Sequence, residues 1–141
     1  MLVHCLYASR PTRGVAAGVV DSILQQSMRN NPARGITGML GYTDDVFVQL
    51  LEGGRDAVCD LFAAIVRDER HADVRLLVYE EIAERRFANW TMGQVNVGRI
   101  NPAVLLRFSD RATLDPFTCS GRTTMALLDE LIASGAVVCR S

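Results

Sequence analysis

Gln49 is the residue of this sequence that most needs a chemical explanation. It lies in the apolar stretch VFVQLLEGG, residues 46–54. A buried carboxamide has N–H donors and an oxygen acceptor, and leaving one of them unpaired costs roughly 1–3 kcal/mol. Gln49 therefore needs a partner, which is either another group of the protein or a ligand.

Several other chemistries are excluded by what the sequence lacks. Its four cysteines are widely spaced without a C-x-x-C pair, which favours reduced structural thiols over disulfides or a zinc site. The histidines, His4 and His71, are not in a metal-ligand spacing, so we expect no metal site. All 15 basic residues are arginine, which excludes a Schiff-base lysine and a phosphate-loop lysine.

Length and composition indicate one domain. A chain of 141 residues with 49% hydrophobic content can build a core without metals or disulfides. The longest apolar run, LFAAIV, is far shorter than a membrane-spanning helix, and the start MLVHCLYASR has no secretory signal. We therefore expect a cytoplasmic protein with no membrane contact. A net charge of −1 with scattered arginines predicts no nucleic-acid partner.

The periodicity of apolar residues predicts the elements that position Gln49. Helices are expected from residue 14 to the sequence NNP, and in the segment of residues 53–71. The residue before a proline disfavours the helical region, so Pro32 should end the first helix and push Asn31 out of it. Alternation and β-propensity predict strands over residues 2–9, 36–42, 46–53, 74–82 and 87–97.

The element order predicts an α+β fold. A βαββαββ order is typical of a ferredoxin-like sandwich, here a five-stranded sheet with both helices on one face. VFVQLL and VRLLV are apolar on both sides, so the other face must be covered as well. Asn101 and Pro102 resemble the start of a helix, and residues 121–135 predict another. We expect these C-terminal helices to pack on the far face, or on that of a partner.

This fold places a set of uncharged side chains around an apolar slot. Tyr7 and Gln49 belong to strands that should be neighbours, Ile23 and Ile65 lie on the two helices, and Asn31 follows the first helix. No charged residue belongs to the slot. Such a slot suits an isoalloxazine ring, whose edge alternates acceptors and a donor that amides complement. The alternative is that Gln49 bonds a neighbouring protein group and the other residues are ordinary core.

At these residues the sequence resembles the BLUF family, blue-light sensors that bind FAD. The resemblance runs through LVHCLYASR, NNPARGITGMLGY, VFVQLLEG, IVRDERH and RRFANWTMGQV. These segments occur in the family's order, and together they are specific. They cover residues 1–97, which implies a complete sensor domain. Residues 98–141 loosely resemble the helical extension of the short, stand-alone members.

The resemblance implies roles for individual residues. Tyr7 matches the photoactive tyrosine that gives an electron to the excited flavin, and Gln49 matches the glutamine that links this phenol to flavin N5 and O4. Asn31 matches the asparagine that bonds the pyrimidine edge. The other matching positions are Asn30, which precedes it, and Ile23 and Ile65, which flank the ring. Trp90 and Met92 match residues of the last strand that carry the signal; they share strand parity, so one at a time would face the flavin if the strand shifts, and the alternative role is core packing.

One position departs from the family pattern. Several members have an arginine just before the isoleucine of the second helix, where this chain has Ala64. Any contact made by that arginine must come from elsewhere or be lost. Arg67 and Asp68, one turn away, are candidates for cofactor contacts, and the alternative is a solvated helix end.

The resemblance implies a photoreceptor and not a turnover enzyme. Light would move an electron and a proton from Tyr7 by way of Gln49 and leave the glutamine amide rearranged. FAD is the expected cofactor, although FMN or riboflavin would fill the same ring slot. With no effector domain attached, the signal must pass to a separate effector protein, and we expect homo-oligomers, dimers or larger.

Two other classes of function are known on the same fold. The first is an acylphosphatase-type enzyme, but its phosphate loop is not recognisable in YASRPTRG. The second is a module that binds a small ligand or nucleic acid. An RNA-recognition strand would need an aromatic pattern that VFVQLLEG does not supply.

Overall fold

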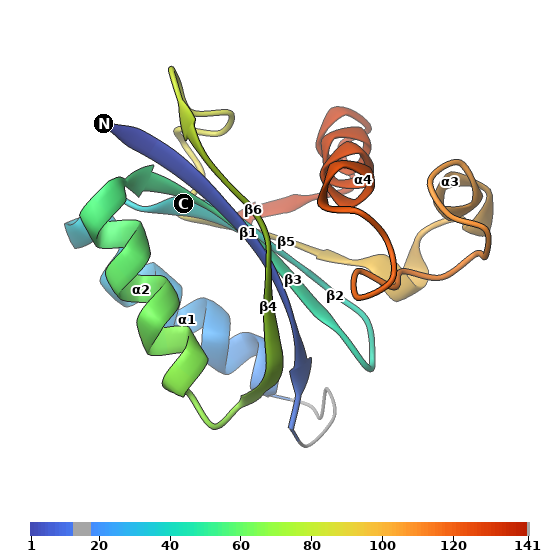
Figure 1. Cartoon of the computed structure of the whole chain (residues 1–141), viewed down its shortest axis with the longest axis horizontal. Coiled ribbons are helices and arrows are strands. Elements are labelled where there is room, and N and C mark those ends of the chain that lie inside the picture. The colour runs from blue at the N-terminus through green and yellow to red at the C-terminus, as the bar shows by residue number, and fades with distance from the viewer. Residues whose placement is uncertain (13–17, 141) are drawn as a thin grey trace.

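The structure is a computed structural model that describes residues 1–12 and 18–140 (Figure 1). The strands are β1 (Leu2–Pro11), β2 (Thr37–Tyr42), β3 (Phe47–Gly54), β4 (His71–Ile82), β5 (Met92–Asn96) and β6 (Val138–Arg140). The helices are α1 (Val19–Arg34), α2 (Arg55–Arg67), the 3-10 helix η1 (Val97–Arg99), α3 (Pro102–Leu106) and α4 (Gly121–Ala133). Within the described residues no helix is long and apolar enough to cross a membrane.

The strands form one six-stranded sheet in the order β4-β1-β3-β2-β5-β6. β1 lies between β3 and β4 and is antiparallel to both, while β2 is antiparallel to β3 and parallel to β5. This is the predicted ferredoxin-like arrangement, which is confirmed. The sequence did not predict β6, which pairs with β5. A strand of three residues is too short for its periodicity to be recognised.

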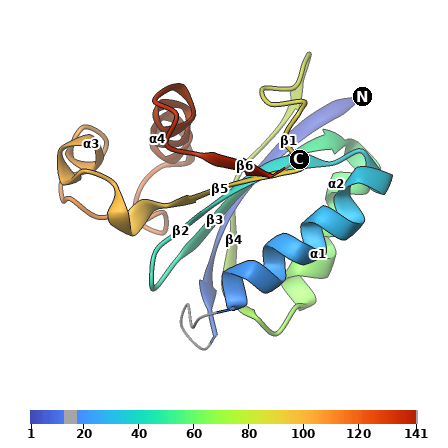
Figure 2. The same ribbon diagram turned by 180° about the vertical axis from the view of Figure 1, so that it is seen from behind.

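Helices α1 and α2 both cover one side of the sheet, which we call the pocket face (Figures 1 and 2). Val3, Cys5 and Tyr7 alternate along β1 and belong to the apolar cluster on this side. Phe47 and Leu51 of β3 join the same cluster. The prediction that both helices pack on one face is therefore confirmed.

Helix α1 does not end where the sequence predicted. It continues through Pro32 to Arg34 and is closed by Gly35, whose φ of 66° is in the left-handed region. The Gly35 N–H bonds to the carbonyl oxygens of Asn31 and Pro32, so the last turn is satisfied. Asn31 is therefore buried inside the helix, and the prediction that Pro32 displaces it is wrong. The predicted start of this helix at residue 14 lies outside the described residues.

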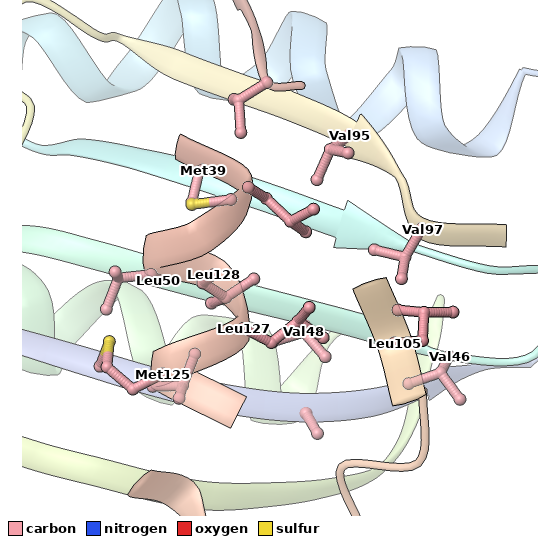
Figure 3. Close-up of a cluster of buried hydrophobic side chains, with 14 of the residues drawn as sticks. Met39, Val46, Val48, Leu50, Val95, Val97, Leu105, Met125, Leu127 and Leu128 are labelled. Atoms are coloured by element: carbon pink, nitrogen blue, oxygen red, sulfur yellow. The ribbon is translucent and has the colours of Figure 1, made fainter. Parts of the chain in front are cut away.

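Helices α3 and α4 cover the opposite side of the sheet, which we call the far face. Figure 3 shows Leu105 of α3 and Leu127 and Leu128 of α4 over Val48 and Leu50 of β3. As predicted, the Asn101 side chain accepts a hydrogen bond from the Ala103 N–H and Pro102 opens α3. The C-terminal helices therefore pack on the chain's own sheet, as expected, and bury its second face.

The last predicted strand is shorter than expected. Strand β5 begins at Met92 and not at residue 87, so Trp90 lies in the loop before it. Phe87 and Trp90 stack with their ring centroids 5.2 Å apart, and Trp90 packs against the far-face core. The aromatic content of this stretch was interpreted as β-propensity, whereas it reflects packing of a loop.

Candidate functional site

A pocket of about 170 Å³ opens on the pocket face between α1, α2 and the sheet. Of the residues predicted for the site, seven line it: Tyr7, Ile23, Asn30, Asn31, Gln49, Ile65 and Asp68. Arg67 is exposed and is not among the lining residues. The sequence analysis did not anticipate the other lining residues, Gln26, Ser27, Arg34, Leu61, Arg70 and His71, and Ala64 was noted only as a departure.

Tyr7 and Gln49 lie directly opposite each other on the neighbouring strands β1 and β3. The Tyr7 hydroxyl donates a hydrogen bond to Gln49 Oε1. At the other end of the amide, Gln49 Nε2 points to Met92 Sδ at 3.6 Å. Tyr7, Gln49 and Met92 thus form a chain of contacts across β1, β3 and β5, and both ends of the buried amide have protein partners.

Burial fixes the protonation of the phenol in this chain of contacts. Desolvation raises the pKa of Tyr7 far above its ordinary value of 10, and the neighbouring Cys5 and Asp68 act in the same direction. The hydroxyl therefore keeps its proton at neutral pH. It is a donor whose proton can leave together with an electron, and Gln49 Oε1 is the atom it faces.

Asn31 supplies a polar group that the protein leaves unpaired. Its side chain is 2% exposed, and its Nδ2 has no hydrogen-bond partner among the described residues. Helix α1 holds it at the pocket, beside Asn30 in the preceding position. An unpaired buried donor costs roughly 1–3 kcal/mol, so the site fits a ligand with an acceptor at this point. A flavin ring, with carbonyl oxygens on its pyrimidine edge, has such acceptors.

The pocket also carries charge, contrary to the sequence-based expectation. The Arg70 guanidinium donates to both carboxylate oxygens of Asp68, and also to Ser22 Oγ at 3.2 Å and Gln26 Oε1 at 2.6 Å on α1. The hydrogen bond from Arg70 holds the pKa of the Asp68 carboxyl below its ordinary value. This ion pair therefore ties the turn after α2 to α1 at the pocket.

His71 is a second lining residue that the sequence analysis set aside. Its Nδ1 lies 2.7 Å from Ser9 Oγ, and its ring packs edge-on to Tyr7 and tilted against Phe47. Burial lowers the pKa of His71, which favours the neutral ring. In the sequence, His71 has no spacing typical of a metal ligand. The signal that points to it is its position at the end of IVRDERH, between the end of α2 and the start of β4.

Met92 and Trp90 lie on opposite sides of the sheet. Met92 is fully buried in the cluster of the pocket face, whereas Trp90 packs against the far-face cluster. The predicted shared strand parity is wrong for this structure, because Trp90 precedes the strand. Of the two residues, Met92 lies on the pocket face.

The chain matches a family model over residues 2–93, and the model is described as sensors of blue light using FAD. The chain belongs to the BLUF family. Its function is therefore that of a blue-light sensor of the flavin-binding type, as the sequence analysis predicted. The family match therefore favours the sensor over the acylphosphatase and nucleic-acid alternatives.

Relatives and solved structures agree with the BLUF assignment. The photoactivated adenylate cyclase subunit beta of Euglena longa is 38% identical over 92 residues, which are 64% of this chain and 11% of that protein. The chain thus spans about a tenth of the length of the curated relatives it matches.

Solved BLUF structures are similar to almost the whole of this chain. The photo-activated state of BlsA has a TM-score of 0.82 at 29% identity, with 94% of this chain and 95% of that chain covered. The dark state of BlrB has a TM-score of 0.74 at 34% identity, with 95% and 96% covered. The similarity to both proteins includes α3 and α4, because it extends well beyond the residues of the family model.

Proposed function

We propose that this BLUF chain is a photoreceptor in which Tyr7 and Gln49 perform the light-driven step beside a bound FAD. The main support is the contact chain from the Tyr7 hydroxyl through the Gln49 amide to Met92, which starts at two lining residues of the pocket. These contacts couple a proton donor, the Tyr7 hydroxyl, to the Gln49 amide, which can exchange its donor and acceptor ends. No turnover of a substrate is part of this proposal.

The pocket residues divide the work of holding a flavin. Asn31 would donate from Nδ2 to a ring carbonyl, Asn30 would contact the same edge, and Ile23 and Ile65 would enclose the ring. Asp68 would contact the cofactor at the rim, where Arg70 neutralises its charge. The pocket is smaller than the ~300–1,000 Å³ usual for drug-sized ligands. It therefore encloses the ring alone, and FMN or riboflavin would satisfy the same contacts.

When bound and excited by blue light, a flavin supplies a one-electron oxidant. Tyr7 would be the donor: its electron would pass to the excited flavin and its proton toward Gln49 Oε1, the atom it already faces, and both would return to Tyr7 afterwards. A carboxamide has a donor end and an acceptor end, so rotation or tautomerisation of Gln49 exchanges what it presents to Tyr7 and to Met92. A change of one buried hydrogen bond shifts a two-state balance by about 1–3 kcal/mol.

The signal leaves through the strand and helices that follow the pocket. Met92 receives the change at Gln49, Trp90 lies two residues earlier in the loop, and α4 packs on the far face. We divide the chain into a sensor domain, residues 1–97, and a helical extension, residues 98–141. Output to a separate effector protein and assembly into homo-oligomers, dimers or larger, are part of the proposal. So is a cytoplasmic location, which the free thiols Cys5, Cys59 and Cys119 support.

Two substitutions test the photochemical roles. Tyr7→Phe and Gln49→Leu are expected to keep a bound flavin and to lose the reversible red shift of its absorption under blue light. Ala64→Ser, a conservative change at another lining residue, is the matched control and should keep the shift. A normal red shift in either of the first two variants would refute the assigned roles.

A further inference from the structure

Glu52 is a buried acidic residue on the far face of β3 that the photochemical proposal does not use. It is fully buried, and it alternates along β3 with Gln49 and Leu51 of the pocket face. Its Oε1 accepts a hydrogen bond from the backbone N–H of Arg86 at 2.9 Å. The backbone N–H of Phe87 also hydrogen-bonds to this carboxyl. A single side chain of the sheet thus holds the loop between β4 and β5.

The same carboxyl has an atom without a partner, and so does its neighbour. Glu52 Oε2 and His4 Nδ1 are both buried and unpaired among the described residues. His4 and Glu52 lie directly opposite each other in the β1–β3 pairing, where side chains of one face are about 4.5–5.5 Å apart at Cβ. The other ring nitrogen, His4 Nε2, lies 2.6 Å from Glu80 Oε1.

These two unpaired atoms complement each other if Glu52 is an uncharged acid. His4 then donates from Nε2 to the Glu80 carboxylate, which leaves Nδ1 as an acceptor. The hydroxyl of a protonated Glu52 is the donor that Nδ1 lacks, while Oε1 still accepts from Arg86. Burial raises the pKa of Glu52, in agreement with the uncharged form, although the backbone N–H bonds and His4 oppose this shift.

The charged groups around this carboxyl come from every neighbouring element. They are His4 on β1, Glu80 on β4, Arg85 and Arg86 in the loop, and Arg122 and Asp129 on α4. Arg86 and Asp129 pair with each other, and Arg85 bonds backbone carbonyls, so the cations nearest Glu52 already have partners. A neutral Glu52 therefore takes no partner away from Arg85 or Arg86.

The loop that Glu52 holds is attached on both sides. Arg85 donates to the backbone oxygens of Glu52 and Gly35 and to Thr37 Oγ1, which ties it to β2 and β3. The Arg86 side chain forms an ion pair with Asp129 on α4. Trp90 accepts a hydrogen bond from the Gly38 N–H of β2 at 3.3 Å. A shift of this loop would therefore reach α4.

We propose that Glu52, as an uncharged carboxylic acid, is the positioning residue that couples the photoactive strands to residues 85–90 and α4. The coupling rests on the proposed function, because it needs a light-driven change at Gln49. Gln49 precedes Glu52 by three residues in β3, and Met92 follows Trp90 by two. The end of the loop thus leads into β5, which contacts Gln49 through Met92, and Glu52 ties its middle to β3.

Three variants test whether Glu52 acts as an uncharged acid or as a charged carboxylate: Glu52→Gln, Glu52→Leu and Glu84→Gln. Gln reproduces a protonated glutamate, with one acceptor oxygen and one donor group, whereas Leu has neither. Glu84→Gln is the matched control, since Glu84 is an exposed glutamate of the same loop. For each variant, flavin absorption and amide hydrogen exchange of residues 85–92 are measured in the dark and under blue light.

The expected result is that Glu52→Gln and Glu84→Gln keep the light-dependent exchange of the unmodified chain. In Glu52→Leu the Arg86 and Phe87 amides should exchange about tenfold faster in the dark, the factor for a lost hydrogen bond, with no further change in light. The flavin red shift should persist in all three variants. The proposal is overturned if Glu52→Gln behaves like Glu52→Leu, or if Glu52→Leu keeps the normal light response.

If Glu52→Leu does not fold, an infrared spectrum of the folded proteins still tests whether Glu52 is protonated. The unmodified chain should show a protonated carboxyl carbonyl band at neutral pH that is missing in Glu52→Gln and present in Glu84→Gln. Absence of that band overturns the uncharged acid. A red shift without any change of exchange in residues 85–92 overturns the coupling but leaves the proposed function intact. If the unmodified chain shows no red shift, the proposed function fails instead.

Discussion

The two faces of the sheet are built for different tasks. On the pocket face, α1 and α2 leave a space lined by amides, a phenol and an ion pair, and the Asn31 amide there has an unpaired donor. On the far face, α3 and α4 close an apolar core around Val48 and Leu50 (Figure 3). Successive residues of the same strands point alternately to the two faces, so each strand contributes side chains to both. One face is therefore shaped to hold a ring, and the other to hold the chain's own helices.

Substitutions in the two cores should separate these tasks. Leu128→Ala, at a fully buried residue of α4 on the far face, should lower the free energy of unfolding by about 2–5 kcal/mol because it leaves a cavity. Flavin binding by the folded protein should change little. Ile23→Ala, at the pocket, should instead weaken flavin binding more than it lowers stability. Chemical denaturation and flavin titration measure the two effects, and equal effects of both variants on binding would contradict the comparison.

The next largest effect is expected at the unpaired amide of the pocket face. Asn31→Ala should weaken flavin binding by about tenfold or more, since one buried hydrogen bond is worth roughly 1–3 kcal/mol. The flavin-free protein should be as stable as before or more stable, because the substitution removes a buried donor without a partner. Asn30→Ala, at the half-buried neighbour, is the control and should have the smaller effect on a fluorescence titration.

A third expected effect is a pH dependence with opposite signs on the two faces. Burial raises the pKa of Glu52 above 4.5, so its contribution to stability is full below that pH and is lost as pH rises through the folded-state value. Arg70 lowers the pKa of Asp68 below 3.8, so its contribution is present above that pH and is lost as pH falls through the folded-state value.

Denaturation across acid to neutral pH measures both signs. Glu52→Gln should remove the loss of stability that the unmodified chain shows as pH rises above 4.5, the ordinary value of this carboxyl. Asp68→Asn should remove a loss that appears in acid. A Glu52→Gln profile parallel to that of the unmodified chain at every pH would contradict the far-face assignment.

The sequence predicted the parts of the site that follow local patterns. Alternation placed Tyr7 and Gln49 on one face of adjacent strands, and helical periodicity placed Ile23 and Ile65 opposite them. Asn31 reached the predicted site for a different reason, since it lies inside α1 and not beyond its end. The local preference of the residue before Pro32 was overridden by the cap at Gly35.

What the sequence could not predict depends on contacts between distant segments. Arg70 joins the pocket through Ser22 and Gln26, which lie more than 40 residues earlier in the chain. The contacts of Glu52 with Arg86 and with His4 likewise depend on the register of the sheet and the path of a loop. Periodicity assigns a face to a residue but does not identify its partner.

The absorption spectrum of the purified chain before and after blue illumination tests the central claim most directly. The account predicts the bands of a bound flavin, a small shift of these bands to the red in light, and recovery in the dark. A colourless protein that takes up no added FAD, FMN or riboflavin would contradict it, and so would a bound flavin whose bands stay unchanged under illumination.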